Sequence, residues 1–323
     1  MPRVAVIGCG LWGKNLVRNF NNLQVLEAIC DTDIDRIKLL TKEYREVKVY
    51  HNLDDVLSDP EVTAVAIATP SDTHYQIAMK CLKAYKHVYV EKPIATTSNE
   101  AIELNEEADK NRLVLMVGHL LLYHPAVNRL KTLIAEGYLG KICHIQSDRL
   151  NYNPRKNDLS VIWDLAPHDI SMMSFVLDMD PLQVKSALGY VTTPGRVMDV
   201  AHIDLLFPEG VSGHVHNSWI HPNKQVKLLV RGTEMTAILD DTETSHKLHL
   251  YSNIAYDNRV VEYPDYIDIE PLKLECQHYI NCINKQIKPR SDGLNGYKVV
   301  KILEEAEKIL SIVPSALTSI NPH

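Results

Sequence analysis

The sequence VAVIGCGLWG, residues 4–13, decides the fold. Four apolar residues predict a short buried strand, three glycines spaced Gly-x-Gly-x-x-Gly follow at once, and an amphipathic helix is expected to begin near Lys14. In this setting Gly8 allows a tight turn, Gly10 lets a ligand approach the backbone, and Gly13 allows the helix to pack closely. Unpaired N–H groups at the start of the helix would point at an anion. The stretch therefore predicts a strand-turn-helix unit that binds a pyrophosphate.

A carboxylate ends the second predicted strand. Asp31 follows the apolar run Val25–Cys30 and stands 18 positions after Gly13. Such a carboxylate can accept hydrogen bonds from both ribose hydroxyls and would repel a 2′-phosphate, so the predicted cofactor is NAD rather than NADP. Arg36 lies close in sequence and weakens that preference. The alternative is a glycine-rich turn that binds no cofactor.

Short apolar runs alternate with amphipathic stretches over residues 1–119. Runs that are apolar almost throughout are typical of parallel strands covered on both faces. We expect strands at Val4–Ile7, Val25–Cys30, Val62–Ala68, His87–Val90 and Leu113–Val117. Helices are expected at Tyr75–Ala84 and Asn99–Lys110, the second with Ser98 as its N-cap. The repetition predicts an N-terminal Rossmann domain, with a doubly wound parallel sheet, over residues 1–119.

The pattern changes from Tyr138 onward, where longer segments alternate between apolar and polar residues. We expect strands at Ile142–Leu150, Val184–Val191, His202–Phe207, Ser212–His221, Val226–Arg231 and Met235–Leu239, and final helices at Leu272–Asn284 and Gly296–Ser311. Residues 120–323 are therefore predicted to form a C-terminal α+β domain with a large, mostly antiparallel sheet for substrate binding and oligomerisation. One sheet face is expected to be apolar and exposed, which favours a homodimer or homotetramer.

Length, composition and charge narrow the class of protein. A chain of 323 residues suits two domains, and 45% hydrophobic and 23% charged residues are ordinary for a soluble protein. The net charge of −7 argues against nucleic acid or an anionic membrane as a partner. The six cysteines lack the paired short spacing of a zinc site, and no run approaches the roughly 20 apolar residues that span a bilayer. We therefore expect a cytoplasmic protein with reduced thiols and no bound metal.

A lysine follows the apolar run His87–Val90, in the sequence Glu91-Lys92-Pro93. Open α/β sheets bind ligands at the carboxyl ends of their strands. An ammonium group placed there is expected to contact a ligand, and the following proline restricts the backbone around it. The alternative is a solvated lysine that begins a loop.

Four motifs, in this order, resemble the glucose-fructose oxidoreductase and inositol dehydrogenase family (Gfo/Idh/MocA). They are the glycine fingerprint, Ala68-Thr69-Pro70, His74 and Glu91-Lys92-Pro93. The resemblance covers essentially the whole chain, and it implies that Lys92 lies beside the nicotinamide and contacts the sugar hydroxyl being oxidised. It also implies cofactor contacts from the matching residues, which are Gly8, Gly10, Leu11, Trp12, Gly13, Asp31, Thr69, His74, Glu91 and Lys92.

A second family signature, an aspartate four residues before a histidine, matches Asp164-Leu165-Ala166-Pro167-His168. The segments GHLLLYHP, residues 118–125, and WDLAPHD, residues 163–169, look like those of bacterial sugar-nucleotide 3-dehydrogenases. That branch oxidises C3 of UDP-N-acetylglucosamine or of its uronic acid to a 3-keto sugar. The predicted substrate contacts are Tyr123, Arg155, Trp163 and Asp164.

Oxidation of a secondary alcohol needs a hydride acceptor and a base for the hydroxyl proton. His168 is the better base because its reference pKa of about 6.5 suits neutral pH. Pro167 suggests that a helix begins here, and a helix N-terminus would keep His168 neutral. Lys92 would stabilise the developing alkoxide, and Asp164 would hold a substrate hydroxyl. The alternatives are a capping or core histidine at position 168 and a plain N-cap at position 164.

Weaker signals have structural alternatives. Arg155 and Lys156 could pair with a diphosphate or could be solvated loop charges. His214 and His216 point to one face of a strand, as two metal ligands would, but no nearby cysteine or carboxylate is expected to complete a set, so a structural role is favoured. His119, Tyr123 and His124 follow the fifth predicted strand and could reach the ligand cleft or line the domain junction.

Two other functions fit the same residues. An inositol or free-sugar dehydrogenase of the same family would act without the nucleotide. A non-catalytic NAD-binding regulator would share the fold, although Lys92, Asp164 and His168 argue against it.

Overall fold

The computed structural model describes residues 1–153, 159–192, 197–253 and 260–314, which form two compact units. The first unit contains Met1–Tyr123 and Ile269–Val300, and the second contains His124–Asp268 and the described residues from Lys301. The first boundary lies near the expected residue 119, but the range 120–323 is divided between the units. Residues 269–300 join the first unit because helix α8 (Pro271–Lys285) buries Tyr279 there, against Tyr89 at a ring separation of 5.8 Å.

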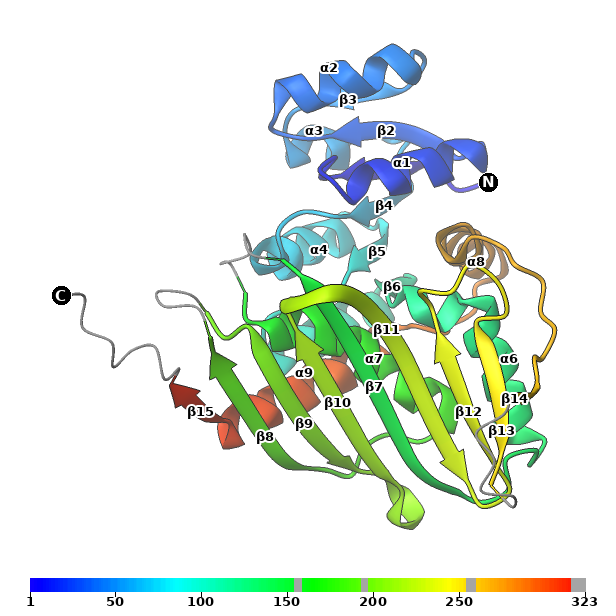
Figure 1. Cartoon of the computed structure of the whole chain (residues 1–323). Helices are drawn as coiled ribbons and strands as arrows, with labels where there is room; N and C mark the ends of the chain where they lie inside the picture. The colour runs from blue at the N-terminus through cyan, green and yellow to red at the C-terminus, as the bar shows by residue number, and fades with distance from the viewer. Residues whose placement is uncertain (154–158, 193–196, 254–259, 315–323) are drawn as a thin grey trace. The chain divides into compact units, whose positions relative to one another are not determined.

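A six-stranded parallel sheet of order β3-β2-β1-β4-β5-β6 forms the core of the first unit (Figure 1). Its strands are β1 Val4–Ile7, β2 Leu26–Cys30, β3 Lys48–Tyr50, β4 Ala64–Ile67, β5 His87–Glu91 and β6 Leu115–Gly118. Every residue of β1, β4 and β6 is buried, which explains their continuous apolar sequences. This strand order is that of a Rossmann fold, so the predicted doubly wound sheet is confirmed.

Helices connect these strands. They are α1 Gly13–Asn22, α2 Ile34–Glu43, α3 Leu53–Ser58, the 3₁₀ turn η1 Ser71–Thr73, α4 His74–Lys83 and α5 Ser98–Lys110, followed after β6 by η2 Leu120–Tyr123. The N-cap of α5 is Thr97, not Ser98 as predicted. Thr97 Oγ1 accepts from the Glu100 N–H at 3.2 Å, and Glu100 Oε2 accepts from the Thr97 N–H at 3.2 Å. This reciprocal pair satisfies two backbone donors, which Ser98 cannot do from its position inside the helix.

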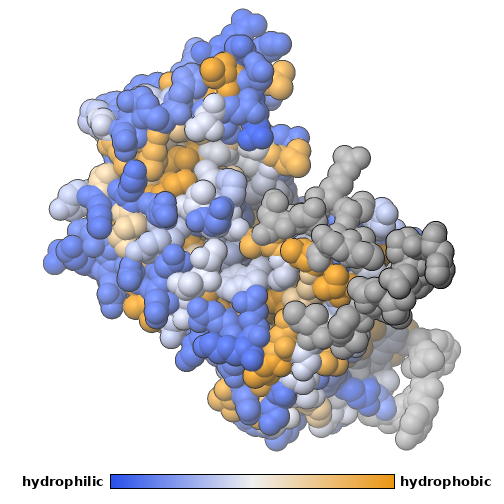
Figure 2. Space-filling model, turned by 90° about the vertical axis from the view of Figure 1, so that its left-hand side faces the viewer, coloured by the Kyte–Doolittle hydropathy of each residue, from blue (hydrophilic) through white to orange (hydrophobic). Residues whose placement is uncertain are grey.

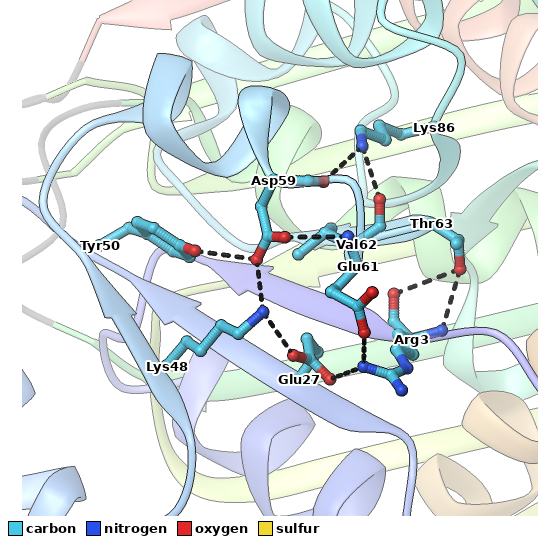
Figure 3. Close-up of polar contacts among 9 residues, drawn as sticks. All are labelled: Arg3, Glu27, Lys48, Tyr50, Asp59, Glu61, Val62, Thr63 and Lys86. Atoms are coloured by element: carbon cyan, nitrogen blue, oxygen red, sulfur yellow. Dashed lines mark hydrogen bonds and ion pairs between the residues drawn. The ribbon is translucent and has the colours of Figure 1, made fainter.

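Polar contacts tie together the amino edge of this sheet (Figure 3). Lys48 Nζ lies 2.8 Å from Glu27 Oε1 and 2.9 Å from Asp59 Oδ2. The Tyr50 hydroxyl donates to the same Asp59 oxygen at 2.8 Å. The buried Lys86 ammonium donates to two main-chain oxygens, at 2.9 and 2.6 Å. Because ligands bind such sheets at the opposite, carboxyl edge, we assign this network to stability.

Asp59→Asn is expected to lower the free energy of unfolding by about 1 kcal/mol at neutral pH. The hydrogen bond from Lys48 lowers the pKa of Asp59 from 3.8 to about 2. A carboxylate with a lowered pKa stabilises the fold above its unfolded pKa, and this contribution is lost as the pH falls from 3.8 to about 2. Urea unfolding of both proteins should show the difference at neutral pH and its loss through that window. An equal deficit in the exposed control Asp54→Asn would contradict the assignment.

The second unit is built on nine described strands in the order β14-β13-β12-β11-β7-β10-β9-β8-β15 (Figure 1). They are β7 Ile142–Tyr152, β8 Gln183–Val191, β9 Val200–Leu206, β10 Ser212–Ser218, β11 Ile220–Gly232, β12 Met235–Asp240, β13 Leu248–Ser252, β14 Val260–Glu262 and β15 Ser311–Pro314, with a 3₁₀ turn η3 Pro208–Gly210. Only the β7–β10 and β8–β15 pairs are parallel among them. The predicted α+β unit with a large, mostly antiparallel sheet is therefore confirmed.

Helices α6 (Pro125–Ala135) and α7 (Val161–Leu177) pack on one face of this sheet. Helix α9 (Gly293–Ile309) begins in the first unit and ends in the second, two residues before its expected end. The sheet face turned toward α7 carries Ile145 and Val215, both fully buried. Alternation along β7 and β10 thus supplies the apolar layer between sheet and helices.

The other face of strands β7, β9 and β10 is polar, so the expected exposed apolar face is wrong for this part of the sheet. His202 stacks on His216 at a ring separation of 4.3 Å. His214 Nδ1 lies 2.7 Å from Asp204 Oδ1, and His216 Nδ1 lies 3.4 Å from Asp148 Oδ1. The residues that alternate with the buried apolar ones on these strands include four histidines and two aspartates, all partly accessible: His144, His202, His214, His216, Asp148 and Asp204.

The surface mixes polar and apolar residues. On the face drawn in Figure 2, hydrophobic groups shown in orange are separated by hydrophilic ones shown in blue. Such mixing is ordinary, because there is too little polar surface to cover a folded protein. Within the described ranges, none of the helices combines the length and apolarity that crossing a bilayer requires.

Candidate active site

The glycine-rich turn between β1 and α1 has a different steric constraint at each glycine. Gly8 has φ +86°, and a Cβ there would lie 2.7 Å from the Ala68 carbonyl oxygen. A Cβ on Gly13 would lie 1.9 Å from the Gly8 carbonyl oxygen. At Gly10 the nearest neighbour of such a Cβ is Arg36 Nη1 at 3.7 Å, which is ordinary contact. Gly8 and Gly13 are therefore required by the turn itself, whereas Gly10 leaves its backbone accessible to a ligand.

Asp31 at the end of β2 is tied to this turn. Its Oδ2 accepts from the Cys9 N–H at 2.7 Å, and its Oδ1 accepts from the Asp33 N–H at 2.8 Å. Arg36 Nη1 lies 3.7 Å from Asp31 Oδ2. Each carboxylate oxygen keeps acceptor capacity for a ribose hydroxyl, so the residues fit a dinucleotide. The Asp31 carboxylate can accept hydrogen bonds from ribose hydroxyls, and the neighbouring Arg36 guanidinium is a cation that could bind a phosphate.

Lys92 follows the last residue of β5 and lies at the carboxyl edge of the sheet. Its side chain is partly buried, and the Lys92–Pro93 peptide bond is cis. The Glu91 carboxylate precedes it in sequence and accepts from the Trp12 indole N–H at 2.5 Å. Trp12 belongs to the glycine-rich turn, and it is 38% exposed while Leu11 beside it is 87% exposed. Lys92 thus stands at the edge where the turn presents its ligand-binding backbone.

His74 joins the loops that follow β4 and β5. Its Nδ1 lies 2.7 Å from the Pro93 carbonyl oxygen and its Nε2 lies 2.9 Å from the Thr69 carbonyl oxygen. Burial lowers the pKa of this imidazole, and the charge of Lys92 lowers it further. Both ring nitrogens face protein carbonyls, so the observed role of His74 is to hold the Thr69 loop against the segment after Lys92. Direct cofactor contact by His74 and by Thr69 stays a prediction.

Tyr123 and His119 follow β6 and are buried inside the first unit. The Tyr123 hydroxyl lies 2.9 Å from Ser291 Oγ, and the Arg290 guanidinium stacks 5.2 Å from the Tyr123 ring. Burial and the charge of Lys92 lower the pKa of His119 to about 3, so it is neutral at physiological pH. The polar end of Tyr123 already has a protein partner, and its predicted substrate contact stays a prediction.

Asp164 and His168 lie on helix α7 of the second unit. The helix begins at Val161 with Ser160 as its N-cap, so Asp164 is in the first turn and is not the N-cap. Pro167 lies inside the helix, and the expectation that it starts a helix is wrong. His168 is therefore about two turns from the N-terminus, too far for the helix dipole to keep it neutral. Residues four apart share one helix face, which brings the Asp164 and His168 side chains onto the same side of α7.

A buried carboxylate next to His168 anchors α7 to the sheet. Asp169 is fully buried and accepts from Ser147 Oγ at 2.7 Å, Arg149 Nε at 2.9 Å and Asn217 Nδ2 at 2.8 Å. Partners from two strands fix the rotation of the helix about its axis. Asp169 therefore fixes the direction in which the side of α7 that carries Asp164 and His168 faces.

The remaining predicted substrate residues are placed as follows. Trp163 is 7% exposed, and its indole N–H donates to Glu307 Oε1 at 2.6 Å. Arg155 and Lys156 lie outside the described residues. His214 and His216 do have carboxylate partners, which neighbouring strands supply. Even so, in the part of the chain that the structure describes, no group of three or more His, Cys, Asp or Glu residues could hold a metal ion.

Glu275 lies outside every motif of the sequence, and Asp169, although it ends the WDLAPHD segment, was given no role. Glu275 lies on α8 with a side chain that is fully buried. It occupies a position of the helical repeat formed by Leu272, Cys276, Tyr279 and Ile280, all of which are buried. A glutamate on the apolar face of an amphipathic helix is unusual, and this position in the sequence could have indicated that Glu275 is buried.

Comparison with known proteins decides the family. A family model described as "Oxidoreductase family, NAD-binding Rossmann fold" matches residues 2–119, and the model of the "GFO/IDH/MocA C-terminal domain" matches residues 127–238. The chain belongs to the Gfo/Idh/MocA family. The resemblance predicted from the motifs is thus confirmed, and the chain is an NAD(P)-binding oxidoreductase of this family.

Relatives with a named activity include a sugar-nucleotide dehydrogenase and inositol dehydrogenases. UDP-N-acetylglucosamine 3-dehydrogenase of Acidithiobacillus ferrooxidans is 25% identical over 92% of this chain and 94% of its own length. Its crystal structure superimposes with a TM-score of 0.83 over 95% of this chain and 97% of its own. Inositol 2-dehydrogenase 2 of Saccharopolyspora erythraea is 29% identical over 55% of this chain and 54% of its own. A scyllo-inositol 2-dehydrogenase (NADP(+)) of Bacillus subtilis is 31% identical over 63% and 59%.

Proposed function

We propose that this protein is an NAD-dependent sugar-nucleotide dehydrogenase that oxidises C3 of a UDP-linked N-acetylamino sugar, UDP-N-acetylglucosamine or its uronate, to the 3-keto sugar. The observation that carries the proposal is the match to UDP-N-acetylglucosamine 3-dehydrogenase along nearly the full length of both chains. That match includes the residues of the second unit, which is the part of the chain that we propose contacts the substrate. Bound NAD would accept the hydride from the carbinol carbon.

The roles of the chain's own residues follow from their chemistry. His168 would take the proton of the reacting hydroxyl as the C–H bond breaks and the C=O bond forms. The Lys92 ammonium would donate a hydrogen bond to the same oxygen and stabilise its developing negative charge. Asp164, on the same helix face as His168, would accept a hydrogen bond from a neighbouring sugar hydroxyl.

An inositol or free-sugar dehydrogenase is the second candidate. Its support is that inositol dehydrogenases are as similar in identity, at 29% and 31%, although over about half to two thirds of this chain. The two candidates differ in whether the substrate needs a nucleotide. A non-catalytic NAD-binding regulator is the third, and the presence of Lys92, Asp164 and His168 disfavours it.

A substrate panel tests the proposal. The protein is incubated with NAD and either UDP-N-acetylglucosamine, its uronate, the free amino sugars or inositols, and NADH absorbance is followed. An acceptor for the keto product, such as an aminotransferase with its amino donor, is included because an unfavourable equilibrium would hide turnover. We expect NADH only with the UDP-sugars. Turnover of inositol or of free sugars alone would replace the proposal with the second candidate.

Asp31→Ala is expected to relax the preference for NAD over NADP. The Asp31 carboxylate would repel a 2′-phosphate, and its removal leaves Arg36 to attract one. Affinities for NADH and NADPH, measured by fluorescence titration, give the ratio directly. Asp31→Asn is the matched control, because it removes the charge but retains an acceptor for the Cys9 N–H. Equal affinity of the wild type for the two cofactors would refute the assignment of NAD.

Self-association as a homodimer or homotetramer is also proposed, now through a polar rather than apolar sheet face. The histidine and carboxylate face of β7, β9 and β10 offers hydrogen-bonding groups to a second copy. Light scattering at micromolar concentration measures the mass in solution. A monomer would contradict this part of the proposal.

A further inference from the structure

Two glutamates of the first unit, the partly buried Glu91 and the fully buried Glu275, share one tyrosine hydroxyl. Tyr89 Oη lies 2.9 Å from Glu91 Oε1 and 3.1 Å from Glu275 Oε2. Tyr89 and Glu275 are both fully buried, and Tyr89 comes from β5 while Glu275 comes from α8. A tyrosine hydroxyl has a single proton and can donate to only one of the two carboxyl groups. The second contact is a hydrogen bond only if the other carboxyl group supplies the proton.

The surroundings decide which glutamate is protonated. Burial raises the pKa of Glu91, but hydrogen bonds from the Trp12 indole N–H, at 2.5 Å to Glu91 Oε1, and from Tyr89, together with the charge of Lys92, oppose that rise and favour the carboxylate. Glu275 has no such cation, and its Oε1 is buried with no hydrogen-bond partner among the described residues. Burial, and then the charge of Glu91, raise the pKa of Glu275 well above its usual range. A carboxylate would leave that oxygen with an unsatisfied negative charge, which is far costlier than a neutral carbonyl.

A glycine provides the space in which the Tyr89 hydroxyl meets the Glu91 carboxylate. Gly118 ends β6 and is paired with Glu91 in the sheet. A Cβ at Gly118 would lie 2.7 Å from Tyr89 Oη and 2.9 Å from Glu91 Oε1. The backbone of β6 thus makes room for the hydroxyl and the carboxylate side by side.

We propose that Glu275 is a neutral carboxylic acid that positions Glu91, by donating to the Tyr89 hydroxyl, which donates in turn to the Glu91 carboxylate. Glu91 holds the Trp12 indole, so the chain links α8 to the glycine-rich turn and to the segment that carries Lys92. Glu275 and Tyr89 are positioning residues in this scheme. The inference rests on the proposed function only in assigning Lys92 to catalysis, because the protonation and the link to the turn do not depend on the substrate.

The titratable groups that face Glu275 come from three elements. They are Tyr89 and Glu91 of β5, Tyr123 of η2, and Cys276 of α8, with Lys92 beyond Glu91. Burial raises the pKa of the Tyr89, Tyr123 and Cys276 groups, so these remain protonated at neutral pH. The Glu91 carboxylate and the Lys92 ammonium are then the two charged groups of this cluster, and the protonated Glu275 carries no charge.

Infrared difference spectroscopy tests the protonation directly. The wild type at neutral pH should show the carbonyl band of a protonated carboxyl group, which Glu275→Gln abolishes. Glu106→Gln, on the exposed face of α5, is the matched control and should leave the band unchanged. Absence of the band in the wild type, or its persistence in Glu275→Gln, would overturn the proposal. Neither result depends on which alcohol the protein oxidises, so the proposed function can fail while this inference stands.

Cofactor titration tests the positioning role. Glu275→Gln keeps a neutral donor beside Tyr89, so NADH affinity and its dependence on pH should stay close to those of the wild type. Tyr89→Phe removes the donor to Glu91, and we expect about a tenfold loss of NADH affinity. In a plot of NADH affinity against pH, the loss of affinity on the acid side should also move to higher pH in Tyr89→Phe, because Glu91 loses a hydrogen bond that lowers its pKa. If Glu275→Gln lost affinity as strongly as Tyr89→Phe, an ionised Glu275 would be indicated instead. Should Tyr89→Phe fail to fold, the infrared comparison still decides.

Discussion

Lys92→Met is expected to lower kcat by about 10²- to 10³-fold while leaving NAD affinity nearly unchanged. The lysine follows β5 at the carboxyl edge of the sheet, and we expect its ammonium to contact the oxygen that changes charge during the reaction. A donor that strengthens its hydrogen bond only in the transition state affects kcat rather than ground-state binding. Steady-state kinetics with the substrate that the panel identifies give kcat, and NADH titration gives the affinity.

Two further variants separate charge from bulk. Lys83→Met, at the exposed end of α4 in the same unit, should leave kcat unchanged. Lys92→Arg keeps a positive charge but spreads it over a planar group, so its kcat should lie between those of Lys92→Met and the wild type. Full activity of Lys92→Met would remove this residue from the mechanism.

The fold was largely predictable because its main strands are buried on both faces or alternate regularly. β1, β4 and β5 are nearly continuous apolar runs, which few other structures allow. β3 was missed because Lys48-Val49-Tyr50 is too short and too polar to stand out. The return of α8 to the first unit was missed for a different reason. An amphipathic helix shows which of its faces is buried, but not which sheet covers that face.

The candidate site was predictable where a motif spells out a local geometry. The three glycines lie in one tight turn, and Asp31 follows β2 and accepts a hydrogen bond from the Cys9 N–H of that turn. Pro167 misled because a proline more often begins a helix than lies within one, and the capping Ser160 is a weaker signal. Asp169 and Glu275 act through partners 20 and 186 residues away, at Arg149 and Tyr89. Residues so far apart in the sequence form no recognisable motif, so these contacts become visible only in the folded structure.

Gly13→Ala is expected to lower both the stability of the protein and its affinity for NADH. The new methyl group would lie 1.9 Å from the Gly8 carbonyl oxygen and 2.9 Å from its carbon. These are backbone atoms of the same tight turn, so the start of α1 must move away from β1. Overpacking of this kind costs about 1–3 kcal/mol, and the displaced N–H groups can no longer converge on the pyrophosphate. Urea unfolding and NADH titration measure the two losses.

Gly10→Ala is the matched control within the same turn. Its methyl group would meet only Arg36 Nη1, at 3.7 Å, so the free energy of unfolding should stay close to that of the wild type. Affinity for NADH should nevertheless fall, because the methyl group would occupy the space through which the pyrophosphate approaches the backbone. If Gly10→Ala bound NADH normally, the pyrophosphate could not lie against this turn. If Gly13→Ala were as stable as the wild type, the close packing of α1 on the turn would be refuted.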